Sequence, residues 1–475
     1  MHELPLALTF DDVLLVPRRS RIRSRADVAT RTQLTGRIAL EIPVVSANMD
    51  TVTTAPMAIA LAQLGGIGVL HRFLSVEDEV AEVARVKRFR TRVIADPHTI
   101  EAGATFARAR AEVERLGVSG LLVVDGDGRL AGILTARDLR AGDDPAAAVA
   151  AQMTPLERLV TGPPGITPEE ALALLHHHRI EKLPLADADG RVAGMVTLRD
   201  LQQEARYPRA TRDDEGRLRV AAAIGVRGGY LERAEALLAA DADALVLDIA
   251  HGHAESALHA VRELKRRFPE ADVIAGNVAT AEGVRDLAAA GADAVKVGIG
   301  PGFACTTRLV AGVGVPQFSA VLECAEAARE AGVPLIADGG IRRPGDLAKA
   351  IAAGASTVMV GSLLAGRSES PGDVVRRRGR LYKVYRGMAS RSAAGARLAI
   401  EGRGDALDQY VPEGEEMEFP LRGPVDEVIG ELIGGLRSGM SYVDSATIGE
   451  FWKNASFVRQ TEAGQRETHP GSPGE

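Results

Sequence analysis

The residues best suited to do chemistry lie in one glycine-rich stretch, GIGPGFACTTR, which spans residues 298–308. It contains Cys305, one of only two cysteines among 475 residues. A cysteine reacts as the thiolate, and neighbouring cations and backbone dipoles lower its pKa. Arg308 could supply the cation and the glycine amides the backbone dipoles, while Thr307 could orient water or relay a proton. The stretch therefore predicts a nucleophile that adds to an electrophilic carbon, with a small buried thiol as the alternative.

Two further glycine-rich turns indicate a phosphate-bearing ligand. ADGGIRRPGD (337–346) and GSLLAG (361–366) each follow an apolar run. Glycines let the backbone approach an anion closely, and the amides of such turns bind phosphate. Asp338 could accept hydrogen bonds from both hydroxyls of a ribose. Ordinary tight turns are the alternative in each case.

The pattern of apolar runs predicts the scaffold that brings these loops together. Short β-branched runs alternate with amphipathic helical stretches, which is typical of parallel strands covered by helices. Eight strands in this arrangement predict an α/β fold, a (β/α)8 TIM barrel with its active site at the C-terminal ends of the strands. An open doubly wound sheet is the alternative. The runs are 42–50, 66–72, 220–226, 244–252, 272–280, 294–302, 333–341 and 357–366.

A duplicated segment interrupts the barrel pattern. Residues 120–139 and 182–201 match at an offset of 62 residues, and each copy places two strands around a DGR turn before a helix that opens with Arg-Asp-Leu. Duplication of this kind predicts two copies of one small unit packed as a module. The copies resemble tandem cystathionine-β-synthase (CBS) motifs, which implies a module that senses adenine or guanine nucleotides; a purely structural insert is the alternative.

This interruption sets the domain boundaries. Residues 1–91 and 204–475 are expected to form the catalytic barrel with a C-terminal flap region, and 92–203 the CBS module. The three consecutive histidines 176–178 do not predict a metal site, because consecutive helix positions point in different directions.

Composition narrows the function classes. A net charge of −7 and a pI near 5.9 do not favour a nucleic-acid-binding surface. No cysteine–histidine grouping has zinc spacing, and Cys324 is expected to belong to the core. The N-terminus lacks the features of a signal peptide, and no apolar run is long enough to span a bilayer. We expect a cytoplasmic protein that binds neither nucleic acid nor membrane.

Several motifs together resemble the IMP dehydrogenase / GMP reductase family. They lie at residues 8–17, 43–53, 65–72, 275–280, 295–317, 336–366 and 382–390, and the resemblance covers nearly the whole chain, the CBS pair included. The resemblance implies a homo-oligomer, a tetramer or octamer. It also implies a covalent bond between the cysteine and purine C2, and hydride transfer between that carbon and a nicotinamide cofactor.

Site residues follow from the same resemblance. Cys305 would be the nucleophile, with Thr307 and Glu413 transferring protons. Substrate would contact Ser46, Asp338, Gly340, Gly361, Ser362, Tyr385, Gly387 and Met388, and the cofactor would contact Asp248, Asn277 and Gly298. Carbonyls of Gly298, Gly300 and Cys305 would hold K⁺ or another monovalent cation, with Glu467 from a neighbouring subunit. Two departures are Phe303, where the family usually has a phosphate-binding serine, and Ala389, where it usually has glycine.

The flap segment, residues 391–410, separates two reactions. In the family, the dehydrogenase uses an Arg-Tyr pair there to activate water. None of Arg391, Arg397 and Arg403 precedes a tyrosine here, and Tyr410 follows a glutamine. The segment therefore favours GMP reductase, which converts GMP and NADPH to IMP, ammonia and NADP⁺.

Other stretches divide between the two branches. Residues 317–328 and 366–373 resemble the reductase, whereas the N-terminal half and the segment 434–443 resemble the dehydrogenase. The alternative function is IMP dehydrogenase, which forms XMP from IMP, NAD and water. A more remote alternative is a nucleotide-binding regulator without catalytic activity. ATP or GTP is the expected effector at the CBS pair.

Overall fold

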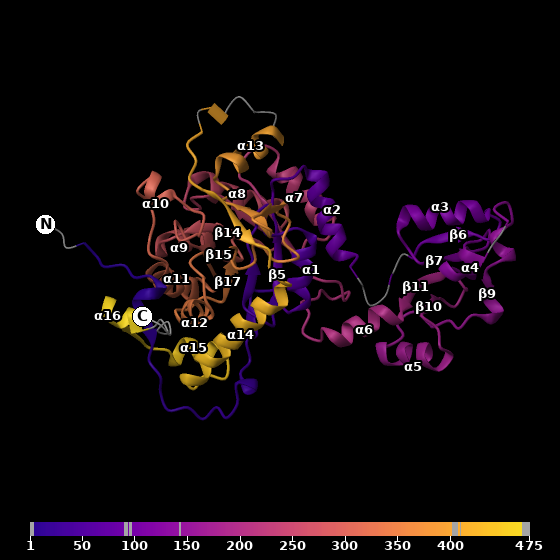
Figure 1. The fold of residues 1–475 in the computed structure, drawn as a ribbon, viewed down its shortest axis with the longest axis horizontal. Helices are drawn as coiled ribbons and strands as arrows, with labels where there is room; N and C mark the ends of the chain where they lie inside the picture. The colour runs from indigo at the N-terminus through magenta and orange to yellow at the C-terminus, as the bar shows by residue number, and fades with distance from the viewer. Residues whose placement is uncertain are drawn as a thin grey trace. The chain divides into compact units, whose positions relative to one another are not determined.

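The computed structural model describes residues 4–89, 94, 97–141, 144–400, 407–408 and 410–467 (Figure 1). The chain folds as two compact units, residues 1–89 with 209–475, and residues 90–208. The expected boundaries lay at 91/92 and 203/204. The first boundary differs by two residues and the second by five, because helix α6 (Leu198–Arg206) continues the insert past residue 203.

The larger unit is a closed barrel of eight parallel strands, which confirms the predicted fold class. The ring runs β12-β13-β14-β15-β16-β17-β4-β5, so the N-terminal β4 and β5 close it between β17 and β12. The strands are β4 (Val44–Ser46), β5 (Ile67–Leu70), β12 (Val220–Ile224), β13 (Ala244–Asp248), β14 (Val273–Val278), β15 (Ala294–Val297), β16 (Leu335–Asp338) and β17 (Thr357–Val360).

Strand periodicity separates two layers of core. In β12, Val220, Ala222 and Ile224 face the surrounding helices, whereas Ala221 and Ala223 face the barrel interior. The hairpin formed by β2 (Thr32–Gln33) and β3 (Ala39–Leu40) adds Leu34, Ile38 and Leu40 to the interior cluster. Both faces of each strand are therefore covered, which is why these strands read as continuous apolar runs.

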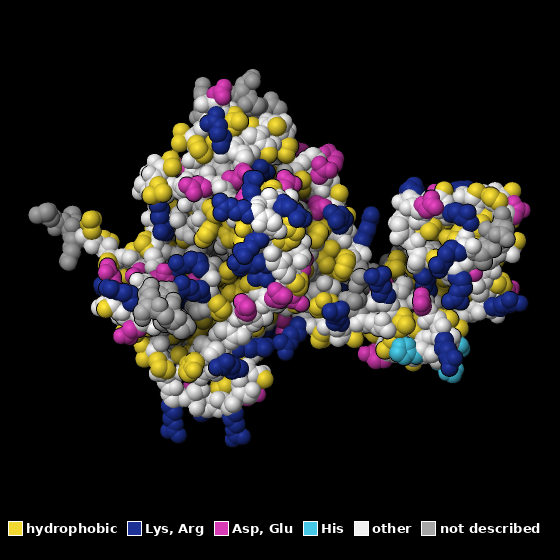
Figure 2. Space-filling view, in the orientation of Figure 1, with side chains coloured by type: hydrophobic (Ala, Val, Ile, Leu, Met, Phe, Trp, Pro, Cys, Tyr) yellow, Lys and Arg dark blue, Asp and Glu magenta, His cyan; other side chains and the backbone are white. Residues whose placement is uncertain are grey.

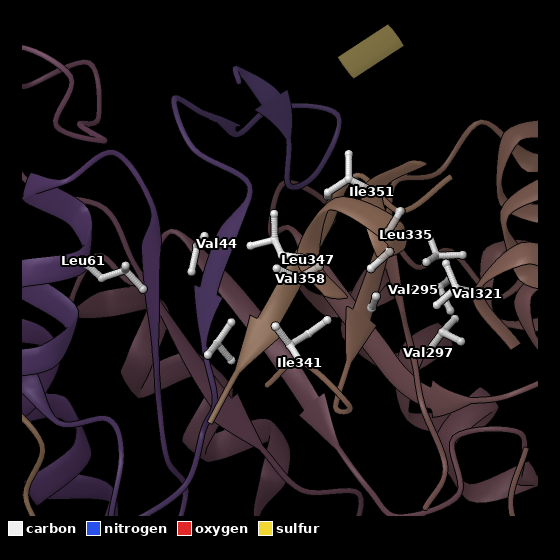
Figure 3. Packing of buried hydrophobic residues seen from close by; sticks show 14 of the residues in the cluster. Val44, Leu61, Val295, Val297, Val321, Leu335, Ile341, Leu347, Ile351 and Val358 are labelled. Carbon is white, nitrogen blue, oxygen red and sulfur yellow. The ribbon is translucent and has the colours of Figure 1, made fainter. Parts of the chain in front are cut away.

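Helices cover the outside of the barrel. Leu347 and Ile351 of α12 lie against the apolar side chains of β16 and β17, among them Leu335 and Val358 (Figure 3). The barrel helices are α1 (Ala55–Gln63), α2 (Val76–Lys87), α7 (Tyr230–Ala239), α8 (Glu255–Arg267), α9 (Ala281–Ala289), α11 (Gln317–Ala331), α12 (Pro344–Ala352) and α14 (Val425–Tyr442). Cys324 of α11 is fully buried, as expected, and burial raises the pKa of its thiol to about 12.

Segments after β17 complete this unit. The three-stranded sheet β18-β19-β20 comprises Val374–Arg377, Arg380–Arg386 and Glu416–Pro420, and helix α13 (Arg391–Ile400) lies between its last two strands in sequence. Near the C-terminus, α15 (Ile448–Asn454) and α16 (Glu462–Glu467) flank β21 (Phe457–Arg459), which pairs with β1 (Val13–Leu15).

The insert has the predicted internal repeat. One copy contains β6 (Thr99–Glu101), α3 (Phe106–Leu116), β7 (Gly120–Val124), β8 (Leu130–Thr135), α4 (Ala136–Ala141) and β9 (Thr154–Pro155). The other contains α5 (Pro168–His178), β10 (Lys182–Ala186), β11 (Val192–Thr197) and α6. In both copies a threonine hydroxyl at the end of the second strand donates to an aspartate three residues later, Thr135 to Asp138 and Thr197 to Asp200.

The histidines of α5 lie on the surface of the insert, where their side chains are exposed (Figure 2). Within the described ranges, no group of three or more His, Cys, Asp or Glu side chains is placed to hold a metal ion. No helix among the described residues combines the length and the apolar character needed to cross a bilayer.

Candidate active site

A cavity of about 830 Å³ opens at the C-terminal ends of the barrel strands. This volume is near the upper end of the range usual for ligand pockets. The loops after β4, β5, β12, β13 and β15 line it, together with the ends of β14 and β16 and the segment between β19 and β20. Of the expected site residues, the lining includes Cys305, Thr307, Glu413, Asp338, Tyr385, Gly387, Met388, Asp248, Asn277, Gly298 and Gly300.

Cys305, Thr307 and Glu413 form a short chain of hydrogen bonds. The Cys305 thiol donates to Thr307 Oγ1 over 3.3 Å, and that hydroxyl donates to Glu413 Oε2 over 2.7 Å. A proton can therefore pass between the sulfur and a carboxylate that is 108 residues away in sequence. This arrangement suits a nucleophile that must lose and regain its proton.

Backbone pairing brings these distant segments together. Cys305 bridges Gly414 in an antiparallel arrangement, with Thr306 N donating to Glu413 O and Glu415 N donating to Ala304 O, each over 2.9 Å. Gly387 N in turn donates to Glu415 O over 2.9 Å. The cysteine loop, the segment before β20 and the segment after β19 are therefore fixed to one another.

A buried lysine, which we did not predict, organises the floor of the cavity. Lys296 of β15 is only 2% exposed, and its ammonium donates to Asp338 Oδ2 over 2.8 Å and to Asn277 Oδ1. Asn277 Nδ2 completes the triangle by donating to the same oxygen of Asp338 over 2.9 Å. A buried charge requires such pairing. Its signal in the sequence is a lysine inside the otherwise apolar strand AVKV.

A bulge in strand β14 directs the Asn277 side chain toward Lys296 and Asp338. The pairing of β14 with β15 shifts register between Gly276 and Val278, so Asn277 is the extra residue of a bulge, and bulges re-aim a side chain. Next to it, only glycine fits at position 298. A Cβ there would lie 2.0 Å from the Asp338 carbonyl oxygen. The bulge and the glycine allow β14, β15 and β16 to converge below the cysteine loop.

Tyr385 lies on the wall beside Asp338. Its side chain is 3% exposed, and burial is the larger cause that raises its pKa, followed by the nearby Asp338 and Cys305. Its hydroxyl contacts Met49 Sδ at 3.7 Å. A Cβ at Gly361 would lie 3.4 Å from the tyrosine oxygen. The turn after β17 is thus directly adjacent to this neutral hydroxyl.

Phe303, which stands where the family usually has a serine, belongs to a cluster of three aromatic rings. Phe303 is 55% exposed, lines the cavity and lies against Phe419 of β20 with ring centroids 5.6 Å apart. Phe419 in turn lies 5.2 Å from Tyr385, edge to face. Where a serine would offer a hydroxyl, Phe303 therefore offers an apolar contact between the cysteine loop and β20.

A partly buried ion pair positions the segment with Gly387 and Met388. Arg386 donates through Nε to Asp50 Oδ2 over 2.8 Å, and its backbone N–H donates to Thr51 Oγ1. Asp50 N also contacts Met388 Sδ at 3.4 Å. The loop after β4 is therefore joined to the chain that carries Met388 into the cavity.

Four of the expected substrate-contact residues do not line the cavity. Ser46 is fully buried, and Thr53 Oγ1 donates to the Ser46 Oγ over 2.8 Å. Ser46 therefore lies below residues 47–49, which line the cavity. Gly340 and Ser362 are partly exposed at the ends of β16 and β17, as is Gly361 beside Tyr385. Direct substrate contact by Ser46 is therefore not supported by its position.

The expected cation site is only partly matched. The Gly298 carbonyl already accepts Asn277 Nδ2 over 2.8 Å, and Glu467 is exposed on α16 and does not line the cavity of its own chain. Within the described residues of one chain, Glu467 therefore does not complete the expected site.

Two flap side chains reach the cavity. Arg397 of α13 and Tyr410 both line it, and the tyrosine hydroxyl donates to Ala389 O over 3.1 Å. Burial is the larger effect on Tyr410 and raises its pKa. Arg391 is largely exposed, 4.0 Å from Asp408, and Arg403 lies outside the described residues.

The closed barrel and the hydrogen-bonded chain of thiol, hydroxyl and carboxylate define a class of protein, the (β/α)8 barrels with a site suited to a cysteine nucleophile. A family model described as IMP dehydrogenase / GMP reductase domain matches residues 7–471. The chain belongs to this family, whose members are NAD(P)-dependent oxidoreductases of purine metabolism.

Curated relatives and solved structures agree on the family. Inosine-5′-monophosphate dehydrogenase of Nitrosopumilus maritimus is 48% identical over 473 residues, 98% of each chain. That of Aquifex aeolicus is 50% identical over 465 residues, 97% of this chain and 94% of the relative. GMP reductase of Trypanosoma brucei in complex with guanosine 5′-monophosphate has a TM-score of 0.91 and 43% identity, covering 99% and 98% of the two chains. The same enzyme with guanosine 5′-triphosphate gives 0.81 and 40%, covering 96% and 98%.

Proposed function

We propose that this enzyme is a GMP reductase, which uses NADPH to convert GMP to IMP and ammonia. The observation that carries this proposal is the sequence of the flap, in which no arginine of residues 391–410 is followed by tyrosine. A dehydrogenase must hydrolyse its covalent intermediate, and a positioned base contributes about 10²–10⁴-fold to such a step. A reductase has no hydrolytic step, so the loss of the pair costs it nothing.

The first half of the reaction needs a thiolate and a proton for the leaving group. The Cys305 thiol passes its proton to Thr307 as that hydroxyl passes its own to Glu413, along the 3.3 Å and 2.7 Å contacts. The sulfur bonds to purine C2, the bond from C2 to the amino nitrogen breaks, and the same proton returns along the relay to release ammonia. Atoms and charge balance without water.

The second half forms the C2–H bond of IMP. Bound NADPH would supply the hydride to C2. The sulfur–C2 bond then breaks with its electron pair on sulfur, and the Cys305 thiolate takes up a proton that Glu413 receives from solvent and passes on through Thr307. The cavity fits a cofactor beside the nucleotide, because Asp248, Arg72 and Asn277 line a polar wall next to the cysteine loop.

Placement of the nucleotide follows from the same walls. Asp338 would accept the ribose hydroxyls, since Lys296 and Asn277 hold its Oδ2 and its Oδ1 accepts no hydrogen bond from the residues that the structure describes. Gly340, Gly361 and Ser362 would offer backbone and hydroxyl donors to the phosphate next to Tyr385. Gly387 and Met388 would cover the base.

IMP dehydrogenase activity, with NAD as the oxidant, is the second candidate. The curated relatives that bear this name support it, as does the position of Arg397, which lines the cavity together with Tyr410. An arginine from the helix α13 could thus stand near the reacting carbon without a neighbouring tyrosine in sequence.

A pair of assays on the purified full-length enzyme separates these activities. One follows nicotinamide absorbance with GMP and NADPH; the other uses IMP, NAD and potassium. We expect oxidation of NADPH in the first, with equal amounts of IMP and ammonia formed. Reduction of NAD in the second, with XMP formed, would overturn the proposal and make Arg397 the residue to substitute next.

The variant Cys305→Ser tests the proposed nucleophile. It should abolish turnover and keep GMP binding, because serine at this position is a far weaker nucleophile than a thiolate. Cys324→Ser, which changes the other thiol inside the core, is the control for cysteine loss as such. A wild-type chain that binds GMP yet is silent in both assays would point to the nucleotide-binding regulator instead.

Regulation and assembly extend the proposal. We propose that the CBS pair binds a purine nucleotide such as ATP or GTP and that the enzyme works as a homo-oligomer. The complex of the Trypanosoma brucei enzyme with guanosine 5′-triphosphate supports the nucleotide part.

A further inference from the structure

The cavity has a second wall, opposite the proposed nucleotide side. In the ring of eight strands, β12 stands four positions from β16, so the loop after β12 lies across the barrel mouth from Asp338. That loop contributes Gly225, Val226, Arg227 and Gly228 to the lining. The neighbouring loop after β5 contributes Arg72 and Phe73. A cofactor that reaches Cys305 has this wall on its far side.

The two arginines of this wall differ in their partners. Arg72 Nε donates to Asp248 Oδ2 over 3.2 Å, and its guanidinium lies 5.0 Å from the Phe73 ring, so its charge is largely compensated. Arg227 is exposed and makes no hydrogen bond or ion pair with any residue that the structure describes. Among the residues that the structure describes, the Arg227 guanidinium on this wall therefore has no carboxylate as an ion-pair partner.

An uncompensated guanidinium in a ligand cavity suits a phosphate group. Its planar fork of N–H donors matches phosphate oxygens in a bidentate manner and stays charged at any physiological pH. Recognition of the extra phosphate of NADP by a nearby arginine is a recurring solution in dinucleotide-binding proteins. GMP itself brings one phosphate, but its expected place is on the opposite side, at the turns after β16 and β17.

We propose that Arg227 binds the 2′-phosphate of the cofactor and makes the enzyme selective for NADPH over NADH. This inference rests on the proposed function only in requiring a reduced cofactor in the cavity. Arg72 and Asp248, already paired, would face the parts that NADPH and NADH share, so selectivity falls to Arg227.

Direct binding tests the proposal without turnover. Fluorescence titration of the full-length enzyme with NADPH and, separately, NADH gives two dissociation constants for each variant. For Arg227→Gln, we expect the constant for NADPH to rise about 10-fold or more, because a charge-assisted contact to phosphate is lost. The constant for NADH should change little, and Arg227→Lys, which keeps the charge without the fork, should fall between.

Arg262→Gln is the control, since Arg262 is exposed on α8, does not line the cavity and undergoes the same change of charge. Equal weakening of NADPH and NADH by Arg227→Gln would overturn the proposal in favour of a contact with the shared pyrophosphate. Unchanged binding of both would also overturn it. Because the titration does not depend on GMP or IMP, these results stand apart from the assays that decide the reaction.

Discussion

At the scale of single residues, the candidate site contains a proton relay made of one threonine hydroxyl and one glutamate carboxylate. None of the described residues that line the cavity around Cys305 is a histidine; a threonine hydroxyl links the thiol to Glu413 over contacts of 3.3 and 2.7 Å. A hydroxyl can donate and accept at once, so it carries a proton either way without a lasting charge of its own. This reversibility suits a nucleophile that must be deprotonated and then restored within each turnover.

Thr307→Val should therefore lower turnover by about 10²–10⁴-fold, because valine keeps the shape and removes the proton path. Binding of GMP, measured by calorimetry, should change little, since the hydroxyl is engaged with Cys305 and Glu413. Thr306→Val is the matched control, because the Thr306 side chain makes no capping bond to the short helix that follows. A Thr307 variant with the wild-type rate would remove the relay from the mechanism.

At the scale of elements, helices α2 and α7 are joined through a buried carboxyl. Glu79 of α2 has no exposed surface and contacts Arg233 of α7, whose Nη2 also donates to Leu74 O over 2.9 Å. Burial outweighs the arginine and raises the pKa of Glu79 to about 8. The loop from β5 to α2, which carries Arg72 and Phe73 into the cavity, is thus tied to this pair.

This pKa predicts a pH dependence of stability. Between the ordinary value of 4.5 and about 8, the folded chain holds a proton that the unfolded chain has released. The free energy of unfolding should therefore fall as pH rises through this window, by at most about 1.4 kcal/mol per pH unit from this group. Denaturant unfolding of wild type and Glu79→Gln at several pH values measures the contribution as the difference in slope.

Glu77→Gln, on the exposed side of the same helix, provides the comparison for Glu79. It should leave the slope as in the wild type. If Glu79→Gln also left the slope unchanged, the carboxyl would be ionised throughout the window and paired with Arg233 as a stable ion pair.

At the scale of the whole molecule, the chain has two units and two kinds of expected ligand. The insert repeats one β-turn-β-helix motif twice, and each copy ends its hairpin in the same threonine–aspartate contact. Such a duplication indicates two copies of one unit that pack together, and both copies resemble CBS motifs.

We therefore expect ATP or GTP to change either the initial rate or the oligomer size of the enzyme. Gel filtration and rate measurements, each with and without the nucleotide, test this on the full-length protein. A pyrimidine triphosphate at the same concentration controls for ionic strength and magnesium binding. No change in either quantity would reduce the insert to a structural role.

Much of the fold could be predicted because it is encoded locally. Eight buried parallel strands require eight apolar runs, and all eight runs became strands of the barrel, although each strand is shorter than its run. The excess belongs to the loops: GIGPGFACTTR follows β15 because its glycines and proline cannot continue a ladder. The internal repeat in the sequence likewise predicted the insert. The C-terminal end of the insert lies beyond the predicted residue 203 because α6 extends to Arg206.

The sequence alone thus determined the barrel strands of this protein, its repeat and its family, and it marked Cys305 as the candidate nucleophile, because each is written in contiguous residues. Only the tertiary structure decided which distant groups meet. It joined Lys296 to Asp338 and Asn277 below the cavity, placed Ser46 beneath the surface, and left Arg227 on the far wall without a partner among the described residues. The physical reason is that barrel closure sets these distances, and residues on non-adjacent strands share a site only once the ring is complete.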